Sequence, residues 1–497
     1  MTLVRALEGR INSRRSRARN SRKKCNADRD ITKSVVSMLE KTSPTQPKKA
    51  LLVLIFCWLL LGSPIFGETI AIVNGTVIDP SKSNPKSTGT VLIENDRIVA
   101  IGASVKPPPN TRLIDAHNKY VLPGLWDMHA HLAALAPIGV APEHYVAYGV
   151  LGVRDMGGYI DQLTQLKADI ASGKRIGPDI AMAGPTLNGP PQPAPFHRVV
   201  ATAAEARAAV DELKKAGVDF IKVHRQTTRE AFFAIADQTK KQHLTFAGHV
   251  PLVMSWIEAS NAGMHSIEHI QTIFENLEPD PSKLVTKFPE LVKRLEGSEG
   301  DGIWATMVKN RTWFDPTMVG YEDSIDSKGA EIGKLRRAAF AAMKVLMQRA
   351  VKAHVPMLAG TDILERHGER LLRELELLVS IGMAPKEVLA AATVNPAASL
   401  GWDGPGRMTP GAPASLLIVD ADPLADMSNL RKLSTVVLRG KVLDSTKLAR
   451  LRELKPSSPP SIWRSGSASP GLKTGADSKA GADEVLNHCQ LRVADLR

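Results

Sequence analysis

Short apolar runs alternate with helical patterns through the middle of the chain. Residues 202–216 and 228–243 place apolar side chains at three- and four-residue spacing, which predicts amphipathic helices. Between such helices, eight short apolar runs are typical of buried strands. Strands that alternate with helices form parallel β/α units, and eight units over about 280 residues indicate an α/β protein with a (β/α)8 TIM barrel. The eight runs cover residues 122–132, 149–158, 179–187, 219–225, 244–251, 266–271, 313–319 and 356–362.

The regions that flank these units are rich in β-type patterns. Residues 69–115 hold short strand-like runs separated by turns such as Asn74-Gly75, and residues 414–444 hold a matching block. We therefore expect a small β-sandwich formed from both ends of the chain. The expected organisation is a basic disordered lead over 1–49, a signal peptide or anchor over 50–67, sandwich strands over 68–122 and 401–445, the barrel over 123–400, and a disordered tail over 446–497.

The net charge of +13 over 497 residues is concentrated near the two termini. Residues 1–49 hold 14 lysines and arginines against 4 acidic residues, and residues 446–497 hold 9 against 5. The arginine-rich run from Arg10 to Lys24 is of a kind that can bind phosphates, but such runs are more often solvated, so no nucleic-acid partner is expected. The three cysteines, Cys25, Cys57 and Cys489, lie outside the central body, which argues against a disulfide framework or a Cys-based zinc site there.

Ala50–Leu61 is a run of twelve apolar residues that follows two lysines. It is shorter than the roughly 20 residues of a membrane span and has the length of a signal-peptide core, with small residues up to Gly67 for cleavage. We therefore expect a periplasmic or secreted protein that meets a membrane only through an uncleaved signal segment. An uncleaved anchor and a cytosolic form are the alternatives. Met38 would give the signal a lead of normal length, so it is the hypothetical start site.

Side chains that can bind metals stand at the ends of several predicted strands. Catalytic groups of such barrels gather at the C-terminal ends of the strands. Because strand residues two apart share one face, the pair in the first strand can point at one ion. Each residue alone also suits a structural role, such as a helix cap or a salt bridge, but together they favour a centre for zinc or a similar divalent ion. The residues are His129 and His131 of the first strand, Lys222 of the fourth, His249 of the fifth, His269 of the sixth and Asp362 of the eighth.

The motifs PGLWDMHAHL, DFIKVHR, FAGHVP, SIEHI and LAGTD resemble the amidohydrolase superfamily, in particular the imidazolonepropionase-related and prolidase-like metal-dependent hydrolases. The resemblance runs from Ile70 to Leu443 and includes the segment GRMTPGAPASLLIVDADPLADMSNL. It implies that His129 and His131 bind one metal and that His249 and His269 bind a second. It further implies that Lys222, carboxylated by CO2, bridges the two metals, and that Asp362 binds the first metal and serves as the catalytic proton-transfer group.

Elementary chemistry agrees with the roles that the resemblance implies. A lysine ammonium has no acceptor and cannot ligate a cation, whereas a carbamate on Lys222 offers two anionic oxygens. Two metals roughly 3.5–4 Å apart can share one hydroxide, which is a nucleophile at neutral pH. Asp362 can then pass a proton to the leaving nitrogen. The expected enzyme is a metal-dependent amidohydrolase with two divalent ions, zinc first among them, that cleaves a C–N bond of a small amide, dipeptide or cyclic amide.

Other interpretations of the same residues stay open. A mononuclear deaminase or imidazolonepropionase-type hydrolase would leave Lys222 unmodified. A lactonase or phosphoesterase would use the same site, and an inactive barrel would only bind its ligand. A homo-oligomer is one possible assembly, because barrels of this type often associate.

The substrate contacts are less well defined by the sequence. Relatives often carry Tyr two residues after the bridging lysine, where this chain has His224, so His224 and the adjacent Arg225 are candidate substrate contacts. Arg154 and Arg366 are further candidates to bind a substrate carboxylate, although a structural pair between Arg154 and Asp155 is favoured. His197 lies on a proline-rich loop, where a structural role is also favoured over one at the entrance.

Overall fold

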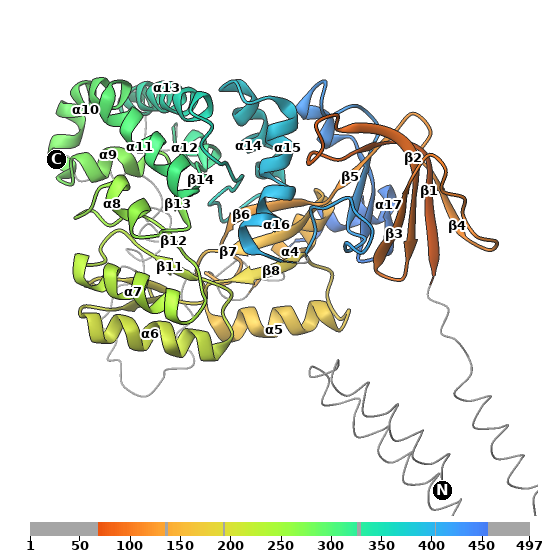
Figure 1. Ribbon diagram of the computed structural model, residues 1–497, viewed down its shortest axis with the longest axis horizontal. Coiled ribbons are helices and arrows are strands. Elements are labelled where there is room, and N and C mark those ends of the chain that lie inside the picture. The colour runs from red at the N-terminus through yellow and green to blue at the C-terminus, as the bar shows by residue number, and fades with distance from the viewer. Residues whose placement is uncertain (1–67, 135–137, 192–193, 326–329, 403, 456–497) are drawn as a thin grey trace, which may run out of the picture. The chain divides into compact units, whose positions relative to one another are not determined.

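The computed structural model describes residues 68–134, 138–191, 194–325, 330–402 and 404–455 (Figure 1). The expected lead and export signal lie outside these residues, as does the tail beyond residue 455, so export stays a prediction. Among the helices in the described part of the chain, none combines the length and the apolar character needed to cross a membrane.

Two parallel sheets make up the middle of the chain. The first has the order β6-β7-β8, and the second has the order β10-β9-β11-β12-β13-β14. All their pairings are parallel, which confirms an α/β fold with parallel sheets. The strands are β6 (Leu125–Ala130), β7 (Val150–Asp155), β8 (Asp179–Met182), β9 (Thr186–Asn188), β10 (His197–Val199), β11 (Ile221–Val223), β12 (Phe246–Gly248), β13 (Ser266–Glu268) and β14 (Trp313–Asp315).

Backbone hydrogen bonds join the two parallel sheets at both sides. At one side, the N–H of Asp219, just before β11, donates to the carbonyl of Met182 in β8 at 2.9 Å. At the other side, Leu358 donates to Phe314 of β14, and Met128 of β6 donates to Ala359. The segment around Met357, expected to be the eighth strand, forms a single parallel bridge with Phe314 instead of a continuous strand.

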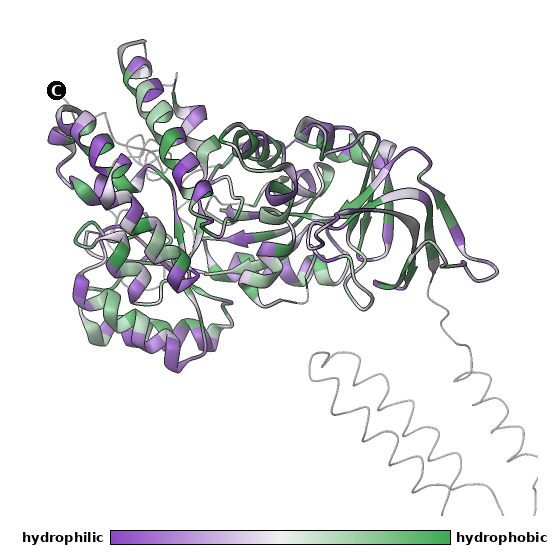
Figure 2. Cartoon of the chain, turned by 45° about the horizontal axis from the view of Figure 1, so that its top comes forward, coloured by the Kyte–Doolittle hydropathy of each residue, from purple (hydrophilic) through white to green (hydrophobic). Residues whose placement is uncertain are grey.

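Amphipathic helices follow most of these strands, and Figure 2 shows hydrophilic and hydrophobic residues along different sides of them. The expected helices over 202–216 and 228–243 correspond to α6 and α7, and α6 begins with a capping box of Thr202 and Glu205. The helices are α4 (Ala141–Ala147), α5 (Ile160–Ala171), α6 (Ala203–Ala216), α7 (Arg229–Lys241), α8 (Trp256–Asn261), α9 (Thr272–Leu277), α10 (Pro281–Glu296), α11 (Ser298–Asn310), α12 (Met318–Ser324), α13 (Ala330–Lys352), α14 (Glu369–Ser380), α15 (Pro385–Ala391), α16 (Val394–Leu400) and α17 (Ser445–Arg452).

Strands from both ends of the described chain meet in one sheet, drawn in red-orange and blue in Figure 1. Its order is β17-β16-β15-β5-β1-β2-β3, and β4 also pairs with β1. The antiparallel pair of β15 with β5 joins the late strands to the early ones. The strands are β1 (Thr69–Ile78), β2 (Lys86–Glu94), β3 (Arg97–Gly102), β4 (Arg112–Asp115), β5 (Tyr120–Pro123), β15 (Leu416–Val419), β16 (Leu433–Leu438) and β17 (Lys441–Asp444).

The predicted boundary of the disordered tail at residue 446 is wrong. Helix α17 covers Ser445–Arg452, and Asp444 caps its N-terminus by accepting the backbone N–H of Lys447. Leu448 and Leu451 are buried in the main hydrophobic core, and the guanidinium of Arg452 donates to the carbonyl of Ala147. These contacts hold the segment on the folded body, although its composition is polar.

The packing of β7 against β6 predicts a strong effect of one added methyl group. A Cβ at Gly152 would lie 2.3–2.7 Å from the buried ring of Trp126, so Gly152→Ala forces overlap in the core. We expect a loss of about 1–3 kcal/mol in the free energy of unfolding, measured by urea denaturation.

Gly302→Ala is the matched control, because a Cβ there meets only Ile257 Cδ1 at 3.8 Å and the site lies inside α11. It should leave stability unchanged or raise it by about 0.5–1 kcal/mol. Equal stability of the two variants would contradict the described packing of Trp126.

Candidate metal centre

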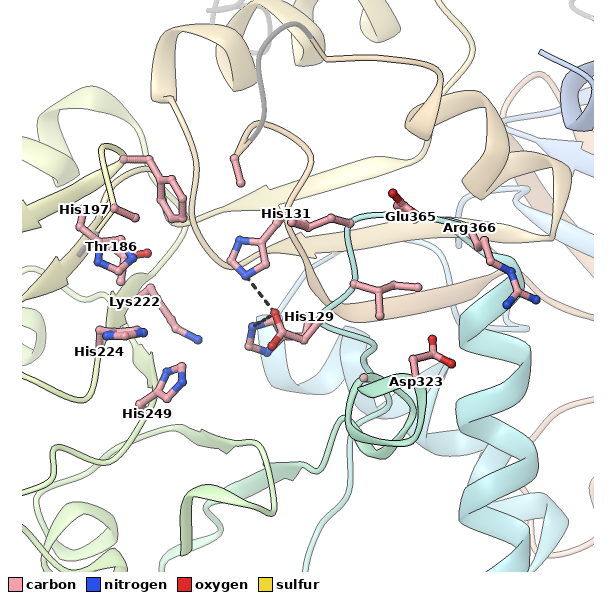
Figure 3. Close-up of a pocket in the computed structure, with 17 residues that line it drawn as sticks. His129, His131, Thr186, His197, Lys222, His224, His249, Asp323, Glu365 and Arg366 are labelled. Atoms are coloured by element: carbon pink, nitrogen blue, oxygen red, sulfur yellow. Dashed lines mark ion pairs between the residues drawn. The ribbon is translucent and has the colours of Figure 1, made fainter. Parts of the chain in front are cut away.

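A cavity of about 420 Å³ lies at the C-terminal ends of the parallel strands. His129 and His131 reach it from the end of β6, Lys222 from β11, and His249 from the residue after β12 (Figure 3). Asp362 lines it from the segment after the Phe314–Met357 bridge. Five of the six residues expected to bind metal therefore line one cavity.

The sixth residue, His269, follows β13 and lies beside the others. Its ring centroid is 4.4 Å from that of His129 and 4.5 Å from that of His249. The Asp362 carboxylate reaches the same cluster, with Oδ1 3.2 Å from His131 Nε2 and 3.4 Å from His129 Nε2. Its other oxygen is 3.6 Å from His269 Nδ1. The structure thus brings together all six residues that strand ends and motifs singled out.

Hydrogen bonds fix the orientation of three of the imidazoles. His131 Nδ1 donates to the carbonyl of Gly157 at 2.8 Å, and His129 Nδ1 lies 3.1 Å from the carboxylate of Glu268. His269 Nδ1 lies 2.8 Å from the hydroxyl of Thr317. In His129 and His131 the carboxylate and carbonyl acceptors place the proton on Nδ1 and leave Nε2 facing Asp362, which is how partners behind a metal-binding histidine set its tautomer.

Burial sets the protonation state of the site. It lowers the pKa of His129, His249 and His269 well below the usual value, so these rings are neutral at pH 7. Burial opposes the charged form of His131 as well, but the hydrogen bond to Asp362 and the negative charges of Asp362 and Asp155 together outweigh it and raise the pKa of that ring. Neutral imidazoles are the form that binds a metal ion, so the three buried rings are ready to act as ligands.

The buried ring nitrogens that lack a hydrogen-bond partner among the described residues include His249 Nδ1 and His269 Nε2. A buried polar atom without a partner is costly, and a bound ion can remove that cost. His129, His269 and Asp362 each offer one ligand atom, and these atoms lie within 4.8 Å of one another. Nitrogen and carboxylate donors at this spacing fit a divalent transition-metal ion.

Gly248 makes room for Lys222 in the cavity wall. Its φ of +131° is in the range that favours glycine. A Cβ there would lie 2.8 Å from Lys222 Cδ, 3.0 Å from Cε and 2.2 Å from the carbonyl oxygen of Val223. The absence of a side chain at residue 248 therefore lets the Lys222 chain lie against the end of β12 and extend into the cavity (Figure 3).

A buried ionic network contacts the site behind His129, and the sequence pattern did not reveal it. Arg154 in β7 donates to Glu268 Oε2 at 2.8 Å, and the same carboxylate contacts His129. Burial favours the protonated acid, but the Arg154 guanidinium, together with His129 and Lys222, outweighs it and holds the pKa of Glu268 well below its usual range. In the sequence, the only sign of Glu268 is its position two residues after Ser266, which places both side chains on the same face of one strand.

The favoured pair between Arg154 and Asp155 is wrong. Asp155 accepts the backbone N–H groups of Leu132 and Gly157, whereas Arg154 binds residues of other strands. Neighbouring residues of a strand point to opposite faces, so the two side chains cannot meet. Arg154 does not line the cavity, and the structure gives no support to its role as a contact for substrate.

The other candidate substrate contacts divide into two groups. His224 lines the cavity, with its ring 4.3 Å from that of His249, and Arg366 lines it as well while it pairs with Glu369. His197 lines the cavity beside His224, at 4.8 Å between rings, although a structural role was favoured for it. Arg225 is not part of the lining and pairs with Glu275 at 3.3 Å.

Several lining residues were not singled out by motifs. They lie on loops and at the end of helix α12, where no strand periodicity marks them. Their side chains supply apolar surface and two carboxylates near the mouth. They include Phe196, Asp323, Ile363, Leu364 and Glu365.

Comparison with known proteins adds independent information about the chain. A stretch of 63 residues is 44% identical to dihydroorotase of Lactococcus lactis subsp. lactis (strain IL1403), and it covers 13% of this chain and 14% of that enzyme. The chain thus matches about one seventh of the length of this curated relative, and the other dihydroorotases that it matches are covered to a similar extent.

Solved structures share the fold over a much longer range. A Xaa-Pro dipeptidase with methionine bound in its active site has 24% identity and a TM-score of 0.60, with 76% of this chain and 100% of that chain covered. Molinate hydrolase has 22% identity and a TM-score of 0.60, with coverage of 82% and 100%.

The sequence model of the amidohydrolase family matches residues 120–443, which include every residue of the candidate centre. This match covers well over half of the chain and agrees with the fold and with the cluster of histidines, lysine and aspartate. The chain belongs to the amidohydrolase family.

Proposed function

We propose that the protein is a metal-dependent hydrolase that cleaves a carbon–nitrogen bond in a small amide, a dipeptide or a cyclic amide. One observation carries this proposal: four imidazoles, Asp362 and Lys222 converge at the cavity, and burial keeps His129, His249 and His269 neutral. Family membership and the solved hydrolases of similar fold support the same reaction class.

The fold that we propose is one (β/α)8 barrel with a small β domain. The backbone hydrogen bonds between β8 and the start of β11, and between β14, the segment around Met357 and β6, support a closed ring of eight parallel segments. The separate eight-stranded sheet, built from both chain ends, supports the expected β-sandwich. Catalytic groups at the C-terminal ends of the parallel segments agree with this architecture.

Two divalent ions, with zinc as the first candidate, would be held by the six residues. His129, His131 and Asp362 would hold one ion, His249 and His269 the other, and a CO2-derived carbamate on Lys222 would join them. When bound, such ions supply Lewis-acid polarisation of the scissile carbonyl and activation of water at neutral pH. The orphaned nitrogens of His249 and His269 support this assignment.

The protein's own residues bind and orient the substrate and move a proton. Asp362, next to the Nε2 atoms of His129 and His131, is placed to take a proton from the attacking water and to give it to the leaving nitrogen. His197 and His224 offer ring N–H groups to polar atoms of the substrate at one wall. Phe196 and Leu364 supply apolar surface that excludes water, and the volume of the cavity restricts the substrate to a small molecule.

A mononuclear hydrolase or deaminase is the second candidate. It is favoured by one observation, the three-ligand group of His129, His269 and Asp362, whose ligand atoms lie close enough for a single ion. In that enzyme Lys222 would remain an unmodified amine.

Metal content separates the two candidates. Elemental analysis of the purified full chain should find about two divalent ions per chain for the binuclear hydrolase, and removal by a chelator should abolish hydrolysis of dipeptides and cyclic amides. One ion per chain would favour the mononuclear enzyme. A chain that stays free of metal after incubation with zinc and bicarbonate would contradict the proposal.

Replacement of Lys222 tests the carbamate. Lys222→Ala should lose one ion per chain and most of the activity, and short carboxylic acids added to the buffer should restore part of both, because their oxygens can take the place of the carbamate. Lys241→Ala, which removes an exposed lysine paired with Asp237, is the control and should retain metal and activity. Full activity of Lys222→Ala without added acid would exclude the carbamate.

Replacement of Asp362 tests the proton transfer. Asp362→Asn should lower kcat by about 10²–10⁴-fold, the usual contribution of a general acid or base, while the circular dichroism spectrum stays unchanged. Asp169→Asn, at a carboxylate on the surface of α5, should leave kcat as it is. An unchanged kcat in Asp362→Asn would remove Asp362 from the mechanism.

A further inference from the structure

Thr317, which lies between β14 and α12, has a backbone conformation that is unusual for its type. Its φ and ψ are both 46°, in the left-handed region, and its side chain is buried. A β-branched residue adopts this conformation rarely because its side chain crowds the backbone there. Such strain persists only where the surrounding structure imposes it, and it is concentrated at functional sites.

The restraint on Thr317 comes from Glu374, on helix α14. The Glu374 side chain is fully buried, and its two oxygens accept the backbone N–H groups of Met318 at 3.1 Å and Val319 at 2.7 Å. These are the first two N–H groups of α12, which have no partner inside their own helix. A carboxyl group from another helix therefore fixes the chain directly after the strained residue.

Thr317 in turn contacts a proposed metal ligand. Its Oγ1 lies 2.8 Å from His269 Nδ1, and His269 itself has a φ of +65°. The backbone N–H of His269 donates to Asp315 at 2.9 Å, which anchors the residue to the end of β14. With Nδ1 held by Thr317, the opposite nitrogen, Nε2, is buried and lacks a hydrogen-bond partner among the described residues.

We infer that Glu374 is a positioning residue for the metal centre: it holds Thr317 in its strained conformation, and Thr317 then sets the orientation of the His269 ring. The inference rests on the proposed function, because His269 must bind a metal for its orientation to matter. Without Glu374, the two N–H groups would need other partners, and the chain at Thr317 would relax towards an unstrained conformation. The hydroxyl would then move away from His269 Nδ1.

Two roles of Glu374 can be told apart by experiment: stabilisation of helix α12 alone, and positioning of the metal centre through Thr317. A residue that only stabilises the helix changes the unfolding temperature and leaves metal affinity alone. A residue that acts through Thr317 changes zinc affinity in the folded protein, typically by 10–100-fold for partners behind a metal ligand. Zinc affinity is therefore the measurement that distinguishes the two roles.

The test uses the full chain and zinc alone, with affinity measured by competition against a chromophoric chelator. Glu374→Gln and Thr317→Val should each weaken zinc binding at the site that contains His269 by 10–100-fold. Valine keeps the shape of threonine but lacks the hydroxyl, whereas Thr317→Ser keeps the hydroxyl and should retain affinity. If both residues act on one histidine, the double variant should be no weaker than the weaker single variant.

Thr239→Val is the matched control, because it removes a buried hydroxyl that bonds to Ile235 within α7, away from the site. Its zinc affinity should equal that of the unaltered protein. If Glu374→Gln does not fold, Glu374→Asp, which keeps the carboxyl group but shortens the side chain, replaces it with the same expected loss.

Unchanged zinc affinity in folded Glu374→Gln or Glu374→Asp would overturn the inference, as would additive losses in the double variant. Failure of the unaltered protein to bind zinc would instead overturn the proposed metal centre. The two failures are therefore distinguished by which protein shows them.

Discussion

The buried guanidinium of Arg154 is the interaction on which the proposed site depends most. From β7 it donates to the carbonyl of Met128 in β6 and to the Ser266 hydroxyl and the Glu268 carboxylate in β13. It also lies 3.4 Å from the carboxylate of Asp315 in β14. A charge without water must be fully paired, so this arrangement couples the relative positions of four strands. Because Glu268 also contacts His129, the same network that satisfies the charge orients a proposed metal ligand.

The strand pattern predicted side chains that the structure brings together at the cavity. Side chains of parallel strands converge at their C-terminal ends, so His249 and Asp362, more than a hundred residues apart, could be placed in one site from the sequence. The same alternation argues against Arg225 as a substrate contact. His224 and Arg225 are adjacent and face different directions, which explains why His224 lines the cavity and Arg225 pairs with Glu275.

Features that depend on contacts between distant loops and helices were beyond the reach of sequence patterns. The partnership of Glu374 with the start of α12 joins residues 55 and 56 positions apart, and no local motif marks it. The left-handed conformation of Thr317 contradicts the preference of its residue type, so sequence alone predicts the opposite. His197 lines the cavity as the first residue of β10, a short strand that the sequence periodicity does not mark.

The pairing of β15 with β5 has a consequence for the order in which the protein can fold during synthesis. Strand β5 leads directly into β6 through Gly124, whose N–H donates to the carbonyl of Ser415. During synthesis the early strands therefore present an open edge until β15 has left the ribosome. Unpaired edges invite association with other chains, so the nascent protein is most exposed to aggregation, and most in need of chaperones, during that interval.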